Sequence, residues 1–378
     1  MSGNGKKVFL TGASGFVASH ILSQLIEEGY KPTASVRSQP KADQILEVHP
    51  EWKGKVDFAF VPDIAVPGAF NDALAAEAEK GGFDYIIHTA SPVTFTVTDV
   101  KKDLIDPAVN GTLEALKAAH EKGGKQLKRF VLLGSAVSIL NSYDDQTVRG
   151  KPYTEDDWNP VTEADAVSSQ NPVLGYNTGK VKAERAAWAY LEENKPVFDL
   201  AVVNPDVILG PMLQPVPSPK NVNETNDFAC YAFFNGTHKA VEDAQFPYFD
   251  FNLFTPLLKL LTHNPKTDVR DVALLHVLAL TSPLASNKRI LTTSGPLSPQ
   301  LIVNTIRKNF PELNSRLPKG GDESLVFPKG LDPTPLNPAR SLEIFRDAKG
   351  KDWEYRGLEE SLTDTVKCIL DLEKKWNA

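Results

Sequence analysis

Short apolar runs alternate with helical patterns over the first two hundred residues of the chain. The apolar runs predict six strands, at residues 8–10, 33–36, 56–61, 85–87, 130–133 and 200–203. Between them, apolar residues at helical spacing predict helices at residues 16–28, 69–79, 106–119 and 175–193. Strands that alternate with helices form parallel βαβ units, whose helices cover both faces of the sheet. The pattern therefore predicts the α/β class, with a doubly wound parallel sheet.

The alternation stops after Val203. Five prolines in residues 205–219 predict a loop, because proline lacks a backbone donor and has a fixed φ. Nine aromatic residues then fall within residues 228–254. This segment has two interpretations, a piece of hydrophobic core or an apolar wall of a substrate pocket. Residues 289–293 predict a late strand.

The C-terminal part of the chain closes with an amphipathic helix, predicted by apolar residues spaced between Leu362 and Leu372. We expect a first domain over residues 1–204, to which a strand returns near residues 265–295. A smaller, mainly C-terminal substrate lobe should contain residues 205–264 and 296–378.

The balance of charged residues argues against some classes of binding partner. Lys and Arg number 41 and Asp and Glu 48, so the formal net charge is −7. An acidic chain is a poor candidate for binding nucleic acid or anionic lipid. The two cysteines cannot form a disulfide framework, and neither they nor the histidines show metal-ligand spacing. The absence of that spacing leads us to expect no metal. The first residues lack the apolar core of a signal peptide, so we expect a cytoplasmic protein.

The junction after the first strand carries a glycine loop of the form G-x-x-G-x-x-A. Gly12 permits the tight turn, Gly15 lets the backbone approach a pyrophosphate, and Ala18 lets helix and strand pack closely. The N-terminus of the following helix offers N–H groups to phosphates. This position predicts a Rossmann-type dinucleotide site. Its loop contacts are expected from Gly12, Ser14, Gly15, Phe16 and Val17.

The end of the second strand indicates which dinucleotide binds. NAD-binding chains place a carboxylate there for the ribose 2′-hydroxyl, whereas this chain has Arg37, followed by Lys41. A guanidinium can pair with a 2′-phosphate and stack on adenine, so we expect NADPH or NADP. Asp63 and Ile64 should lie near the adenine, and the segment with Ala90 and Ser91 beside the pyrophosphate and ribose.

A candidate catalytic pair opens a later helix. Tyr176 and Lys180 are four residues apart and so share one helix face. An adjacent ammonium is expected to lower the pKa of the tyrosine, which would otherwise be near 10. Ser135, at the end of the fifth strand, is well placed to hold a carbonyl oxygen, and Ser138 is its rival.

With these residues, the chain resembles the extended short-chain dehydrogenase/reductases. It is most similar to the NADPH-dependent aldehyde and ketone reductases of fungi, a methylglyoxal-reductase-like group related to plant dihydroflavonol reductases. The resemblance covers most of the chain. The segments that carry it are residues 11–20, 34–38, 106–112, 176–188, 204–205 and 271–273.

The resemblance implies roles for individual residues. Tyr176 would be the general acid, Lys180 would orient the ribose and tune Tyr176, and Ser135 would bind the carbonyl oxygen. Pro205 and Val207 would pass near the nicotinamide carboxamide. The further matches are Arg37 and Lys41 for the adenine phosphate, and Asn110 on a helix facing the active site.

The chain departs from the family pattern in two places. The fifth strand ends in Leu133-Gly134-Ser135, where the family usually has Thr-Ser-Ser. Residues 214–262 match the family poorly, and they should shape the substrate pocket.

Three functions are compatible with these residues. The first is a carbonyl reductase, in which NADPH reduces an aldehyde or ketone, apolar or aromatic, and Tyr176 protonates the oxygen. The second is a sugar-nucleotide epimerase or dehydratase of the same fold; Arg37 and the absence of an acid at residues 135–137 argue against it. The third is a non-enzymatic NADP-sensing module, which has no need of an aligned Tyr and Lys. We expect a monomer or homodimer.

Overall fold

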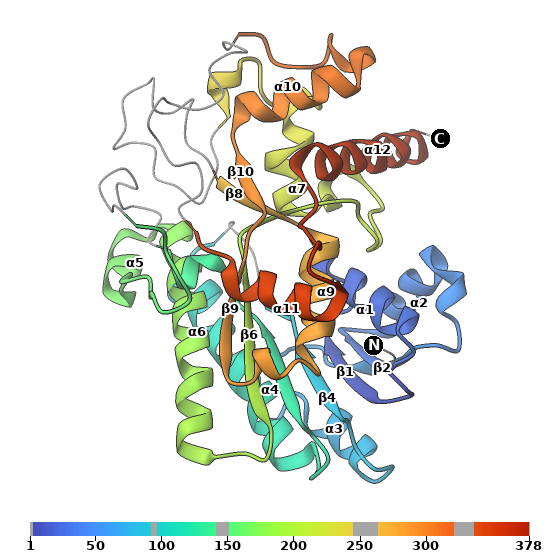
Figure 1. Cartoon of the computed structure of the whole chain (residues 1–378), viewed down its shortest axis with the longest axis vertical. Coiled ribbons are helices and arrows are strands. Elements are labelled where there is room, and N and C mark those ends of the chain that lie inside the picture. The colour runs from blue at the N-terminus through green and yellow to red at the C-terminus, as the bar shows by residue number, and fades with distance from the viewer. Residues whose placement is uncertain (1–2, 92–96, 141–150, 245–263, 321–335, 378) are drawn as a thin grey trace.

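The computed structural model describes residues 3–91, 97–140, 151–244, 264–320 and 336–377. A seven-stranded parallel sheet occupies the lower part of the view in Figure 1. Its order is β3-β2-β1-β4-β5-β6-β9. The strands are β1 (Lys7–Thr11), β2 (Lys31–Val36), β3 (Asp57–Phe60), β4 (Tyr85–His88), β5 (Arg129–Leu133), β6 (Asp199–Pro205) and β9 (Lys288–Thr292). The predicted fold class is confirmed, and the strand order reverses between β1 and β4, where such sheets bind ligands.

Helices cover both faces of this sheet because its strands are apolar on both sides. Val8 and Leu10 point into one core and Phe9, between them, into the other. The first face is covered by α1 (Phe16–Glu27), α2 (Gln39–Val48), α9 (Val269–Ala279) and α11 (Ala339–Lys349). The second is covered by α3 (Asn71–Ala78), α4 (Asp106–Lys122) and α6 (Pro172–Asn194).

A smaller lobe lies above the sheet in Figure 1. Its three strands, in the order β10-β8-β7, are β10 (Gly295–Leu297), β8 (Asn264–Asp268) and β7 (Val207–Leu209). Around them pack α7 (Glu224–Ala229), α10 (Pro299–Asn309) and α12 (Leu358–Trp376). The short helix α5 (Glu163–Ser169) precedes α6.

The described residues also contain short helical turns that connect these elements. They are η1 (Pro50–Trp52), η2 (Lys101–Ile105, a π-helix), η3 (Ala136–Ser138), η4 (Pro219–Asn221), η5 (Tyr231–Phe233), η6 (Val241–Asp243), η8 (Pro283–Ala285) and η9 (Pro311–Leu313). Among the described residues, no helix has the length and apolarity that crossing a membrane requires.

The expectation that residues 205–219 form a loop was wrong in part. β7 lies between Pro205 and Pro211, and its own residues are apolar and free of proline. They pair in parallel with β8. Proline forbids a donor only at its own position, so a short strand fits between two prolines.

The aromatic segment contributes to the core of the smaller lobe. Tyr231, Phe233 and Phe234 are buried there, and Phe228 packs against them. The core interpretation is therefore confirmed for these residues. Residues 245–263, which hold the later aromatics, lie outside the described part of the chain.

Glu155 also differs from expectation, because we interpreted the acidic run at residues 155–157 as a solvated loop. Glu155 is only 8% exposed, and its carboxylate accepts a hydrogen bond from Leu291 N at 3.3 Å. Arg289 of β9 donates to the backbone carbonyls of Glu155 and Asp157. The segment therefore packs against β9, an edge strand of the sheet.

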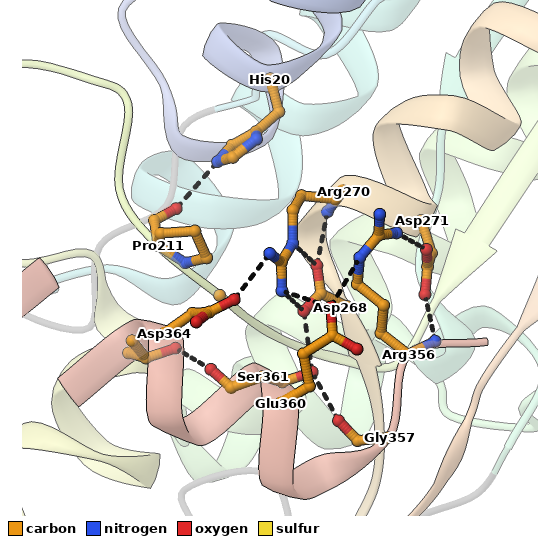
Figure 2. A network of polar contacts seen from close by, with 12 residues as sticks. His20, Pro211, Asp268, Arg270, Asp271, Arg356, Gly357, Glu360, Ser361 and Asp364 are labelled. Carbon is orange, nitrogen blue, oxygen red and sulfur yellow. Dashed lines mark hydrogen bonds and ion pairs between the residues drawn. The ribbon is translucent and has the colours of Figure 1, made fainter. Parts of the chain in front are cut away.

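A buried ionic network joins β8 and α9 to α12 (Figure 2). Asp268 is fully buried and accepts from Arg270 Nη2 and Ser361 Oγ, each at 2.8 Å. Asp271, also fully buried, forms an ion pair with Arg356. Buried charges are tolerated where they are paired in this way. Because α9 packs on α1, the network connects the smaller lobe to the helices of the large sheet.

Candidate active site

The glycine loop has the geometry expected of a phosphate cradle. Gly12 has φ +76°, a conformation that residues with a side chain rarely adopt. A Cβ there would approach the Cα of Ala90 to 3.1 Å, so the loop lies close to the segment after β4. Gly15 N donates to Gly12 O at 2.9 Å, and α1 begins at the next residue without a side-chain cap. Its first N–H groups are thus available to an anion.

Thr11 joins the ends of β1 and β4. Its Oγ1 accepts from Thr89 N at 3.0 Å and from Ala90 N at 3.1 Å. The hydroxyl proton must then go to His88 Nδ1, which is 3.0 Å away. His88 is therefore neutral with its proton on Nε2, in agreement with the burial that lowers its pKa to about 3. These bonds hold Ala90 against the glycine loop.

The residues expected at the adenine end lie on the surface. Arg37 and Lys41 are exposed, as is Asp63. Ile64 instead packs on α4, where a Cβ at Gly111 would come within 2.9 Å of its Cδ1. Ser91 and Ala90 are half-buried after β4. The roles of these residues in binding a cofactor stay predictions.

The Tyr and Lys lie on one face of α6, as predicted. Asn171 caps this helix by accepting from Val173 N and Leu174 N, and Pro172 occupies its first turn. Lys180 Nζ lies 5.8 Å from the centroid of the Tyr176 ring. Both side chains are half-buried.

The structure distinguishes Ser135 from Ser138. Ser135 forms a side-chain hydrogen bond with Tyr176. Ser138 is fully buried, and its hydroxyl has no hydrogen-bond partner among the described residues. Ser135 caps the short turn η3 and Ser138 is its last residue, so sequence position alone could not separate them. Ser135 is the one that lies beside Tyr176.

The pKa of Tyr176 is shifted in the direction opposite to our expectation. Removal from water raises it to about 12, the hydrogen bond with Ser135 opposes the rise, and the charge of Glu224 adds to it. Burial lowers the pKa of Lys180 to about 8, against the attraction of Glu184. Desolvation therefore disfavours the phenolate more than the hydrogen bond with Ser135 favours it. Tyr176 is therefore held protonated, the state required of a proton donor.

Three further side chains had no expected role, although Asn204 lies in a segment that carries the family resemblance. Asn204 Oδ1 accepts from Ser135 N at 2.8 Å, and Glu224 of α7 acts on Tyr176 through its charge. Asp206 follows β6, and burial raises its pKa to about 7. Apart from that resemblance, the sequence marks them only by a place near a strand end or a helix start.

The remaining expected positions are Pro205, Val207 and Asn110. Pro205 and Val207 are buried at the junction of β6 and β7, and Asn110 is exposed on α4. Among the described residues, no group of three or more His, Cys, Asp or Glu could hold a metal ion.

Residues 8–291 match the NAD dependent epimerase/dehydratase family. The chain belongs to this family. The match covers the large sheet and the glycine loop, and it confirms the resemblance to the extended short-chain dehydrogenase/reductases.

Relatives within the family span almost the whole chain. The ketoreductase azaE of Aspergillus niger is 34% identical over 97% of this chain and 98% of its own length. The NADPH-dependent methylglyoxal reductase GRE2 of Saccharomyces cerevisiae is 30% identical over 97% and 98% of the two chains. The crystal structure of yeast methylglyoxal/isovaleraldehyde reductase Gre2 complexed with NADPH superposes with a TM-score of 0.81, at 28% identity, and covers 98% of this chain and 99% of its own.

Proposed function

We propose that this protein is an NADPH-dependent carbonyl reductase that converts aldehydes or ketones to alcohols. The observation that carries the proposal is the hydrogen bond between Ser135 and Tyr176, formed one helical turn from Lys180. Two hydroxyl donors that converge beside a cation can bind a carbonyl oxygen and stabilise the alkoxide as it forms. The names of the similar ketoreductase and methylglyoxal reductase support the same chemistry.

The residues present fit a bound NADPH. Gly12 and Gly15 leave the cradle without side chains at the start of α1, and Lys180 provides donors for ribose hydroxyls. Arg37 and Lys41 are exposed cations after β2, as a 2′-phosphate requires. When bound, the cofactor supplies the hydride for the carbonyl carbon.

The chain's own residues do the rest of the chemistry. Ser135 holds the carbonyl oxygen by a hydrogen bond and polarises the carbonyl group. Tyr176 donates its phenolic proton to the same oxygen as negative charge develops there. Lys180 stabilises the resulting tyrosinate, which water reprotonates. The resting pKa of Tyr176, raised by burial, keeps the proton in place until the oxygen becomes basic enough to take it.

The alternative of a sugar-nucleotide epimerase or dehydratase is less well supported. The turn that follows β5 reads Ser135-Ala136-Val137 and offers no acid. Among the described residues, the carboxylate whose charge acts on Tyr176 is Glu224, from α7 of the smaller lobe. A non-enzymatic NADP-sensing module would leave the bond between Ser135 and Tyr176 without a role.

Three finer points belong to the same proposal. The substrate is a small molecule that is apolar or aromatic near its carbonyl group. The protein acts in the cytoplasm, because its two cysteines suit a reducing compartment. It works as a monomer or homodimer.

A steady-state assay tests the proposed function. NADPH oxidation would be followed with methylglyoxal, aliphatic and aromatic aldehydes, ketones and β-ketoesters, and with NADH in a parallel series. We expect alcohol formation with several carbonyl compounds and a preference for NADPH. Turnover of a sugar nucleotide without net NADPH consumption, and no reduction of any carbonyl compound, would contradict the proposal.

A further inference from the structure

Ser135 is held at the end of β5 by a side chain from the neighbouring strand. Its backbone N–H donates to Asn204 Oδ1 at 2.8 Å. Asn204 belongs to β6, which pairs with β5 up to Leu133 and Val203. Beyond that pair, Gly134 N still donates to Val203 O at 2.8 Å. At Ser135, the side-chain oxygen of Asn204 thus replaces the backbone carbonyl as the acceptor from β6. Ser135 is the residue whose hydroxyl faces Tyr176.

The orientation of the Asn204 amide follows from the chemistry of its partner. A backbone N–H can only donate, so the carbonyl end of the amide must face Ser135. The Nδ2 group then points away, and it has no hydrogen-bond partner among the described residues. Asn204 is fully buried. Among the described residues, the bond to Ser135 N is therefore the contact that favours this orientation of the amide.

Gly134 provides the space for this arrangement. A Cβ at Gly134 would lie 2.0 Å from Asn204 Oδ1, closer than non-bonded atoms approach, and 2.9 Å from Val202 Cγ1. Gly134 does not have the positive φ that would itself require glycine. The missing side chain is therefore needed for room and not for backbone conformation. This is one of the positions at which the sequence departs from the Thr-Ser-Ser pattern.

We propose that Asn204 is a positioning residue for Ser135, and that Gly134 allows it to act by leaving its amide room. The inference rests on the proposed carbonyl reduction. Asn204 fixes the start of the turn that carries the Ser135 hydroxyl, and so fixes the place of that hydroxyl relative to Tyr176. It acts through Ser135 and has no contact with substrate in the proposal.

The kinetic test uses Asn204→Ala and Asn204→Asp. Asn204→Ala removes the acceptor, so kcat should fall by about tenfold or more, while KM and the Kd of NADPH change by less than about threefold. Asn204→Asp keeps an oxygen at the same place and should recover most of the lost kcat. A purely structural role would lower the amount of folded enzyme without this split between kcat and KM. An Asn204→Ala enzyme with unchanged kcat would overturn the proposal.

A double-mutant cycle tests the role of Gly134. Gly134→Ala should lower kcat strongly in the wild-type chain, because the new methyl group displaces the Asn204 amide. In the Asn204→Ala background the same substitution should cost much less, with only the contact to Val202 remaining. Gly357→Ala is the matched control, because a Cβ there meets no atom within 4 Å. Equal losses from Gly134→Ala in both backgrounds would refute the coupling.

The unfolding free energies of the same variants, measured in urea, test the packing of Asn204 and Gly134 independently of the proposed function. If the wild-type protein reduces no carbonyl compound, the proposed function fails and the catalytic role of Asn204 fails with it. The steric coupling would still appear in the unfolding free energies as a smaller loss from Gly134→Ala when Asn204 is absent. Additive unfolding free energies would overturn the packing argument whatever the activity.

Discussion

Lys180 Nζ lies 5.8 Å from the centre of the Tyr176 ring, one turn away on the same face of α6. Both side chains are half-buried, and the loss of water around each opposes its ionisation. Burial raises the pKa of Tyr176 to about 12 and lowers that of Lys180 to about 8. The pair therefore rests as a neutral phenol beside an ammonium that gives up its proton unusually easily. The site therefore has a protonated donor at neutral pH, and it contains a partly desolvated cation, which costs folding free energy.

Because desolvation of the Lys180 ammonium costs free energy, we expect its removal to stabilise the fold while it impairs catalysis. Lys180→Met should raise the Tm at pH 7 by about 1–2 °C. In the wild-type chain the folded state loses the Lys180 proton near pH 8, but the unfolded state keeps it until about 10.5. Wild-type stability thus rises between these values, and the advantage of the variant should shrink there.

Calorimetry from pH 6 to 10 measures the effect. Lys182→Met is the matched control, because Lys182 lies on the same helix, is 43% exposed and is paired with Glu163. Its removal should not stabilise the protein at any pH. A Lys180→Met protein that is less stable than wild type at pH 7 would contradict the burial argument.

Cofactor choice is predicted to depend on Arg37. Arg37→Ala should weaken NADPH binding by about tenfold or more and leave NADH nearly unchanged, since only NADPH carries the 2′-phosphate. Fluorescence titration of both cofactors checks this. Lys31, exposed at the opposite end of β2, provides the control substitution Lys31→Ala. Equal weakening of NADPH and NADH would remove Arg37 from the 2′-phosphate site.

The hydroxyl of Thr11 is predicted to be a structural requirement of the cofactor site. Thr11→Val leaves the N–H groups of Thr89 and Ala90 without their acceptor, at a cost of about 2–4 kcal/mol in unfolding free energy. NADPH should also bind more weakly, because Ala90 is then held less firmly against Gly12.

Urea unfolding and NADPH titration measure these two effects. Thr112→Val is the control, since the Thr112 hydroxyl is buried but donates only to Ala108 O in its own helix. Its loss should cost about 1 kcal/mol or less. If the two valine variants have the same stability, the Thr11 hydroxyl is not the acceptor that holds Thr89 and Ala90 in place.

The large sheet could be predicted because its strands are short apolar runs that alternate with helices, a local signal. Tyr176 and Lys180 could be paired because their spacing matches one helical turn. Asn204 and Ser135 could not be paired, because 69 residues separate them and only the register of β5 and β6 brings them together.

The burial of Tyr176 could not be predicted from the sequence and is seen only in the structure. The sequence places a cation beside Tyr176 and so predicts a lowered pKa, whereas the packing around the phenol raises it. Likewise, β7 was not predicted because prolines flank it. Its pairing with β8 depends only on its own three residues, which lie between those prolines.

Single-turnover reduction by the Tyr176→Phe variant tests whether Tyr176 is the proton donor. Loss of NADPH absorbance would be followed after mixing the enzyme–NADPH complex with a carbonyl compound that the wild type reduces. We expect a rate lower by about 10²–10⁴-fold, with the Kd of NADPH within about threefold of wild type. A Phe variant that reduces the carbonyl within about tenfold of the wild-type rate would show that Tyr176 is not the proton donor.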